Sequence, residues 1–181
     1  MILEERAYIK MKFSKRMDLF GESIFTTLAN MRSERKKQGL EVIDLSIGAP
    51  NIPPTQEVME TIAKEAMKPE NYLYAIQDAV DFQNTVKEWY ERRYGVVIDP
   101  TTELTSLLGS QDGLAHLALT LVDEGDTVLV QDPCYPIFRD GPLLAGAHVV
   151  TMPLLKENDY LIDFDMIDEK TAQDAKYMIV S

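Results

Sequence analysis

The sequence contains one cysteine, two histidines and fewer basic than acidic residues, and each shortage argues against a class of protein. Cys134 has no partner for an internal disulfide, so a disulfide-stabilised secreted domain is excluded. His116 and His148 lie far apart and form no Cys/His cluster with metal-ligand spacing, so we predict no metal site. With 18 Lys and Arg and 30 Asp and Glu, the net charge of −12 argues against a nucleic-acid partner.

Long apolar runs are also missing. No run is long enough to span a bilayer, and the first residues, Met1 to Arg6, lack the apolar segment of a signal peptide. We therefore expect no membrane partner and, by default, a reducing cytoplasm. What the chain does have is ordinary for a globular protein: 181 residues, 45% of them hydrophobic and 27% charged, which is enough for one good-sized core.

The most informative stretch runs from Glu103 to Val122. The apolar residues Leu104–Leu108 predict a short buried strand, Gly109–Gly113 a tight polar turn, and the apolar residues from Leu114 onward a helix. A helix that begins in such a turn leaves backbone N–H groups unpaired at the positive end of its dipole. The sequence therefore predicts a site for a phosphate or carboxylate at this turn.

Two residues of the turn suit an anion. Gly109 lets the backbone come close to a ligand, and Ser110 can cap the helix or donate its hydroxyl to the anion. The turn has neither the Gly-Lys-Ser/Thr of a Walker loop nor the three glycines of a dinucleotide fingerprint, and a strand-to-helix turn that binds nothing is the alternative. His116 follows on the apolar side of the helix, where we expect a core histidine.

The remaining periodicity predicts alternating helices and strands. Helices are expected at residues 22–38, 55–67, 80–94, 137–145 and 163–170, and strands at 42–45, 127–130, 147–152 and 176–181. From Leu104 on, the alternation predicts an α/β fold with a mostly parallel sheet covered by helices. Ligands of such sheets bind beyond the carboxyl ends of the strands, where the turns at 109–113 and 132–136 both fall. Because the last strand would need further elements to cover it, we expect the chain to be the front part of a longer protein.

Five separated motifs together resemble one family. They are Leu45–Asn51 (LSIGAPN), Trp89–Val96 (WYERRYGV), Gly109–Leu114 (GSQDGL), Gly125–Val130 (GDTVLV) and Asp132–Pro136 (DPCYP). In this order and spacing they resemble the class I/II aminotransferases, which are fold-type I enzymes that depend on pyridoxal phosphate. The resemblance runs from about Phe20 to the end. It implies an N-terminal helical arm and the start of a small domain at 1–46, and the first part of the large cofactor-binding domain at 47–181.

The resemblance also implies roles for individual residues. Gly109, Ser110 and Gln111 match the turn that holds the cofactor phosphate, in agreement with the anion site argued above. Tyr135 matches the aromatic residue that stacks on the pyridine ring, although a tyrosine that merely packs in the turn is the alternative.

Two further matches lie earlier in the chain. Ile47 and Gly48 match the loop whose backbone approaches the substrate carboxylate, and an interdomain turn would look the same. Tyr74, with Tyr72 as a rival, matches the tyrosine that reaches the cofactor phosphate of the partner subunit in the family's homodimer. The family usually has Gly and Arg where this chain has Asp78 and Gln83. Because of this difference, the match of Tyr74 to the family's tyrosine rests on a weaker alignment.

The resemblance implies an enzyme that moves an amino group between an amino acid and a 2-oxo acid. Such chemistry needs a lysine that binds the cofactor aldehyde, a carboxylate beside the pyridine nitrogen and, usually, an arginine for the substrate. In the family all three follow an Asn-Pro-Thr-Gly motif expected just beyond Ser181, so we assign no catalytic residue here and expect the chain alone to be inactive. A carbon–sulfur lyase or decarboxylase of the same fold, a non-catalytic phosphate-binding or regulatory module, and a structural interaction domain are the alternatives.

Overall fold

The computed structural model describes residues 12–181, which divide into two compact units. One unit comprises residues 23–106, and the other comprises residues 107–181 together with 12–22. Residues 1–11 of the expected arm lie outside the described residues. The division predicted at residues 46–47 concerns the domains of the enzyme family and stays a prediction.

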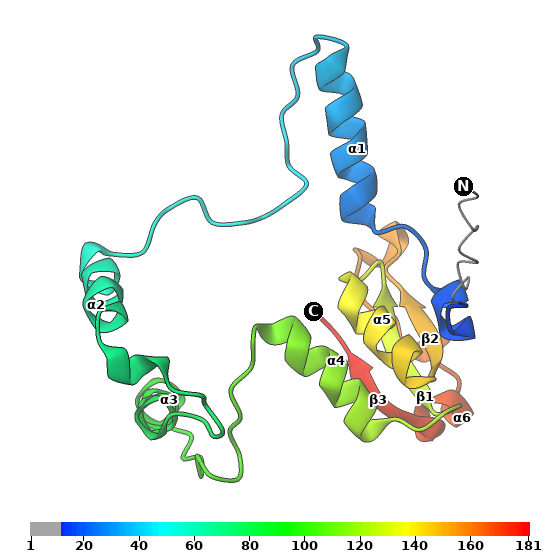
Figure 1. The fold of residues 1–181 in the computed structure, drawn as a ribbon. Coiled ribbons are helices and arrows are strands. Elements are labelled where there is room, and N and C mark those ends of the chain that lie inside the picture. The colour runs from blue at the N-terminus through cyan, green and yellow to red at the C-terminus, as the bar shows by residue number, and fades with distance from the viewer. Residues whose placement is uncertain (1–11) are drawn as a thin grey trace, which may run out of the picture. The chain divides into compact units, whose positions relative to one another are not determined.

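The unit that contains residues 107–181 is built on a parallel three-stranded sheet. β1 (Thr127–Asp132) lies between β2 (His148–Pro153) and β3 (Ala175–Ile179), and both pairings are parallel (Figure 1). The crossover to β2 contains α5 (Pro136–Ala145), and the crossover to β3 contains α6 (Glu169–Asp174). The predicted α/β class and the parallel pairing are confirmed.

The core of this unit lies around the central strand. Val128 and Val130 are fully buried and pack with Val122 on one face of the sheet, with Tyr177 of β3 against them. Leu129 points to the other face and is 4% exposed. Because β1 is buried on both faces, its sequence is a continuous apolar run and not an alternating one, as expected for the interior of a parallel sheet.

The helices of this unit pack on one another and on the sheet. α4 (Ser110–Leu121) packs against α5, which also contacts β1 and β2. The two helices meet at the buried Gly141, where a Cβ atom would lie 3.4 Å from the carbonyl oxygen of Leu114. Three short 3-10 helices complete the unit: η1 (Lys15–Leu19), which contacts α5, η3 (Lys156–Asn158) and η4 (Phe164–Met166).

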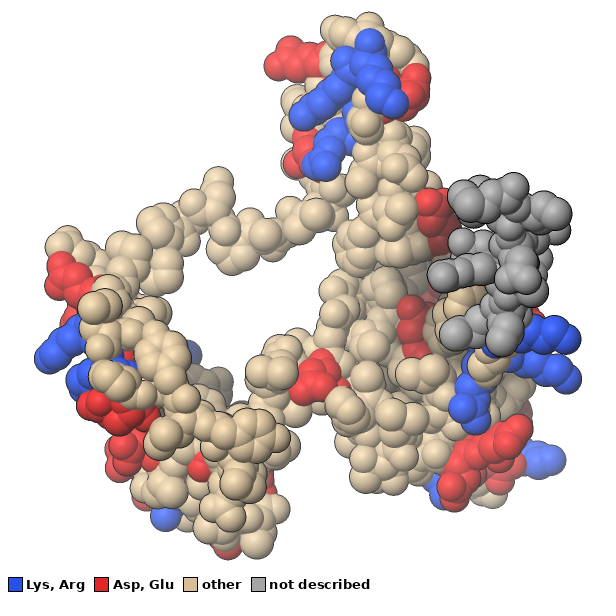
Figure 2. Space-filling model, in the orientation of Figure 1, with Lys and Arg blue, Asp and Glu red and all other residues tan. Residues whose placement is uncertain are grey.

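The unit of residues 23–106 is helical. It contains α1 (Ile24–Lys37), α2 (Gln56–Ala66) and α3 (Val80–Tyr94), all close to the predicted bounds, and the 3-10 helix η2 (Pro69–Tyr72), which was not predicted. α3 ends at Gly95, whose φ of 68° is the left-handed conformation that glycine favours. Lys and Arg side chains gather at the C-terminal end of α1, where the helix dipole stabilises cations (Figure 2). No residue of this unit is buried in the described structure.

The strand predicted at Leu104–Leu108 is wrong. These residues are coil, and the side chain of Leu108 is 98% exposed. Their N–H groups bond to carboxylates and not to a neighbouring strand: Ser106 N donates to Asp78 (2.9 Å) and Leu108 N to Asp112 (3.3 Å). An apolar run without a strand beside it has no ladder to join.

Two other predicted elements also differ. The strand at Val42–Leu45 is wrong, since these residues form extended coil that pairs with no strand among the described residues. The helix at 163–170 is split into η4 and α6. Asp163 caps the first piece and Asp168 the second, each accepting a backbone N–H, so the chain restarts a helix between them. Within residues 12–181, no helix combines the length and apolar character needed to cross a membrane.

Candidate cofactor-binding site

The start of α4 is open to a ligand. Gly109 is the N-cap residue with φ 94° and ψ 154°, a conformation that residues with a side chain rarely adopt. No side chain caps this helix, and the space where a Cβ of Gly109 would lie holds no atom within 4 Å. Among residues 12–181, no hydrogen bond uses the backbone N–H of Ser110 or Gln111. The turn therefore presents two N–H donors and the Ser110 hydroxyl at the positive end of the helix.

Asp112 lies in the same turn, where its charge would oppose an anion. Its carboxylate accepts the Leu108 N–H and lies 2.9 Å from Nδ1 of His116, one turn further along α4. The core position predicted for His116 is wrong, because its side chain is 70% exposed and pairs with Asp112. Both contacts hold the carboxylate against its own helix and the preceding loop.

The second turn at this edge of the sheet carries Tyr135. It follows β1 and occupies the N-cap position of α5, so α5 begins at the carboxyl end of the sheet, as predicted. Gln111 Nε2 donates to the Tyr135 hydroxyl at 3.0 Å, which brings the two turns together. The Tyr135 ring also packs edge-to-face with Phe138, with 6.0 Å between ring centroids. An aromatic residue is thus joined to the turn at the start of α4.

The other predicted site residues lie in the unit of residues 23–106. Ile47 is 66% exposed, and Gly48 lies in the coil that follows, with open space where its Cβ would be. Tyr74 is 91% exposed, whereas the Tyr72 hydroxyl donates to the carbonyl of Ala66 at 2.6 Å. Tyr72 therefore has a local structural partner, which favours Tyr74 for contact with a ligand. The binding roles of Ile47, Gly48 and Tyr74 stay predictions.

One polar pair at the carboxyl edge of the sheet was not predicted. Gln131 is 7% exposed at the end of β1, and its amide oxygen accepts the Ser181 N–H at 2.8 Å while its amide nitrogen donates to the Ser181 hydroxyl at 3.1 Å. The only signal in the sequence is a polar residue that closes an apolar strand. The pair fixes the chain that leaves β3 next to β1, at the same edge as Tyr135.

Cys134, next to Tyr135, is half-buried. Burial, followed by the carboxylate of Asp132, raises the pKa of its thiol. A thiol held in the neutral form is a poor nucleophile and metal ligand. Within residues 12–181, no group of three His, Cys, Asp or Glu side chains is placed to hold a metal ion.

These features fit one kind of cofactor. Two backbone N–H groups and a hydroxyl at a helix start suit a phosphate monoester, and the adjacent tyrosine suits an aromatic ring. Fold and turn geometry together are those of an α/β protein whose parallel sheet carries, near its carboxyl edge, a helix start suited to a phosphate beside an aromatic ring.

Comparison with known proteins identifies the family to which the chain belongs. Residues 41–181 match the family aminotransferase class I and II, and the chain belongs to this family of pyridoxal-phosphate-dependent transferases. It is 38% identical over 171 residues to an LL-diaminopimelate aminotransferase of Aquifex aeolicus, covering 94% of this chain and 44% of the relative. A second relative of the same name, from Dehalococcoides mccartyi, is 36% identical over 172 residues with the same coverage. The chain therefore spans less than half the length of these relatives.

Solved structures agree. Apo-BacF from Bacillus subtilis superposes with a TM-score of 0.79 at 30% identity, over 93% of this chain and 44% of BacF. A probable N-succinyldiaminopimelate aminotransferase from Thermus thermophilus gives a TM-score of 0.77 at 32% identity, over 86% of this chain and 42% of its own. The fold of this chain is that of the corresponding part of these proteins.

Proposed function

We propose that the whole protein is an aminotransferase that moves an amino group between an amino acid and a 2-oxo acid, and that this chain supplies part of its cofactor site. The observation that carries the proposal is the hydrogen bond from Gln111 to Tyr135. It supports the proposal because it joins the open start of α4 to an aromatic residue, within a chain of the matching family. Neither a phosphate turn alone nor a tyrosine alone would indicate this cofactor.

The residues of this chain would hold and orient the cofactor. The N–H groups of Ser110 and Gln111 and the Ser110 hydroxyl would bind its phosphate, and Gly109 would let the phosphate approach the backbone. The Tyr135 ring would contact the pyridine ring, with its hydroxyl fixed by Gln111. When bound, pyridoxal phosphate supplies an aldehyde and an electron-accepting ring.

The proposal also covers the substrate of the whole protein and its oligomeric state. The names of the relatives make LL-diaminopimelate the first amino donor to test. The backbone at Ile47 and Gly48 would approach the carboxylate of the amino acid. We further propose a cytoplasmic homodimer in which Tyr74 reaches the cofactor phosphate of the partner subunit, with neither nucleic acid nor membrane as a partner.

The phosphate site is tested by titrating the 181-residue chain with pyridoxal 5′-phosphate and with inorganic phosphate. We expect Ser110→Ala to weaken both, because it removes one hydrogen bond to an anion, which costs roughly 1–2 kcal/mol, or about 5- to 30-fold in affinity. Ser33→Ala on the exposed surface of α1 is the matched control and should bind as the unmodified chain does. Equal affinity in Ser110→Ala and Ser33→Ala would remove the hydroxyl from the site.

Product analysis separates the alternatives. With pyridoxal phosphate, LL-diaminopimelate and a 2-oxo acid, this chain alone should bind the cofactor but give no sustained turnover, since the lysine that binds the aldehyde has no match in it. In the whole enzyme, a lyase would release ammonia and a thiol, and a decarboxylase carbon dioxide. A regulatory module would bind phosphate without any product, and an interaction domain would not bind phosphate.

A further inference from the structure

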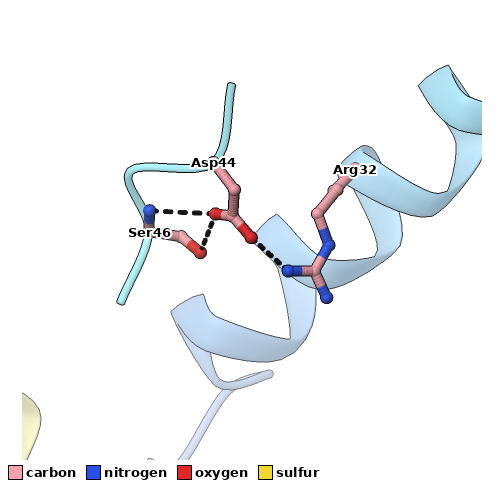
Figure 3. Close-up of polar contacts among 3 residues, drawn as sticks. All are labelled: Arg32, Asp44 and Ser46. Carbon is pink, nitrogen blue, oxygen red and sulfur yellow. Dashed lines mark hydrogen bonds and ion pairs between the residues drawn. The ribbon is translucent and has the colours of Figure 1, made fainter. Parts of the chain in front are cut away.

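An ion pair joins α1 to the chain segment that leads into the predicted substrate loop. Arg32 of α1 donates to the carboxylate of Asp44, and the same carboxylate accepts the Ser46 N–H at 3.0 Å and the Ser46 hydroxyl at 2.6 Å (Figure 3). We call these three residues the Asp44 cluster. Ser46 directly precedes Ile47 and Gly48, so the cluster holds the last residue before the loop to a helix.

The exposure pattern shows which way the segment is turned. Val42 and Ser46 are half-buried, whereas Ile43 and Leu45 are 84% and 89% exposed. The side chain of Asp44, which lies between these two exposed residues, is the one that bonds to α1. Asp44 is the one charged residue among residues 42–46. Its contacts therefore select this rotation of the segment, and with it the direction in which the next residues project.

We propose that Arg32 and Asp44 are positioning residues for the substrate carboxylate: by fixing Ser46, they orient the backbone of Ile47 and Gly48 toward the amino acid. Space at the Gly48 backbone is open, since no atom lies within 4 Å of an ideal Cβ there. The inference rests on the proposed function, because it assumes that this loop meets the carboxylate.

An ordinary surface ion pair would not support this inference, because exposed pairs contribute little. The Asp44 cluster differs from such a pair in two ways. The carboxylate has two additional donors from the chain that it positions, and it links elements 12 residues apart. The pair between Lys37 and Glu34 on the same helix spans one turn, at 3.8 Å, with both side chains more than half exposed. That pair provides the control.

The protonation state of Asp44 is consistent with a fixed carboxylate. The hydroxyl of Ser46, then its N–H, then Arg32 lower the pKa of Asp44 to about 2. The cluster therefore stays ionised across the pH range in which enzymes of this kind work.

The test follows the amide signals of Ile47 and Gly48 by NMR in the full 181-residue chain. Acetate is the probe, as the simplest carboxylate, and acetamide is its uncharged control, both at constant ionic strength. Asp44→Ala removes every contact of the cluster and should raise the half-saturating acetate concentration at least threefold. Arg32→Gln and Asp44→Asn each remove only the ion pair, so both should show a smaller rise of similar size. Lys37→Gln should behave as the unmodified chain.

Phosphate titration at Ser110 and Gln111 is run on every variant, because a purely structural effect would weaken phosphate as well. Loss of both responses in Asp44→Ala and Arg32→Gln would therefore overturn the positioning role. An unchanged acetate response in all variants would overturn it too. A third outcome is that phosphate binds but acetate does not shift the amide signals of Ile47 or Gly48 in the unmodified chain. In that case the assignment of this loop to the substrate carboxylate is wrong, while the proposed cofactor site is unaffected.

Discussion

Carboxylates organise much of the local backbone of this acidic chain. Asp44, Asp99 and Asp168 each accept both a backbone N–H and a hydroxyl from a Ser or Thr two or three residues further on. In all three, these bonds lower the pKa of the carboxyl group. Part of the negative charge that the composition shows is therefore engaged in turns and caps, where it satisfies backbone donors.

Asp44 allows a prediction at this scale. Its pKa of about 2 lies below the value of about 3.9 expected in the unfolded chain. Ionised Asp44 therefore stabilises the folded state above about pH 4, and this contribution is lost as the pH falls from about 4 to about 2. Titration of the Asp44 carboxyl carbon by NMR should give a midpoint near 2.

The variants of its neighbours give the controls. Ser46→Ala should raise the midpoint more than Arg32→Gln does, because the Ser46 hydroxyl makes the largest contribution to the lowered pKa. A midpoint at the ordinary value, or one insensitive to Ser46→Ala, would show that the hydrogen bonds of Asp44 do not form in solution.

At the scale of elements, the sequence predicted helices better than strands. Apolar spacing and capping residues are local signals, and α3 begins and ends at the predicted residues. A strand needs a neighbour, which a local pattern cannot supply. Leu104–Leu108 and Val42–Leu45 look like strands, but carboxylates take the N–H groups of Ser106, Leu108 and Ser46.

In the candidate site, too, local features could be predicted from the sequence and tertiary contacts could not. The rule for parallel sheets places the turn after β1 at the carboxyl edge, but it placed the turn at 109–113 there only through a strand at 104–108 that does not form. The hydrogen bond from Gln111 to Tyr135 nevertheless joins the two turns. The particular side-chain bond could not be predicted, because it depends on how α4 packs against α5. Ile47, Gly48 and Tyr74 rest on resemblance, and their roles stay predictions.

Two glycines, one inside α5 and one at its C-terminal end, give a prediction. Gly141 is buried between the helices, yet a Cβ there would lie 3.4 to 3.7 Å from its neighbours, which is ordinary contact. Gly146 has a φ of 95°, and a Cβ there would lie 3.3 Å from Cα of Glu124. We expect Gly146→Ala to lower the free energy of unfolding by about 1–2 kcal/mol. Gly141→Ala should be neutral or stabilising by up to about 1 kcal/mol, because alanine favours a helix.

Urea unfolding of the two variants measures the difference. If Gly141→Ala destabilised the chain as much as Gly146→Ala does, the helices would have to pack more closely than described, and the contact between α4 and α5 would need revision.

At the scale of the whole molecule, the buried hydrophobic residues are unevenly distributed. Every one that the described structure contains, from Ala118 to Met152, lies in the unit with the sheet. The unit of residues 23–106 has long helices but no buried residue. Since most helix stability in proteins comes from burying an apolar face, these helices lack their main source of stability within their own unit.

This distribution predicts two levels of protection from hydrogen exchange. Backbone amides of β1, with Val128 to Val130 buried, should be the slowest to exchange. Amides in the middle of α1, α2 and α3 should exchange at least about tenfold faster, because segments with few buried contacts open locally at low free energy. Mass spectrometry of peptides from the exchanged chain, with amides of β2 as an internal reference, measures both. Equal protection of α3 and β1 would mean that residues 23–106 bury an apolar face in solution, and the search for what covers it would begin with the exposed Trp89, Tyr90 and Tyr94.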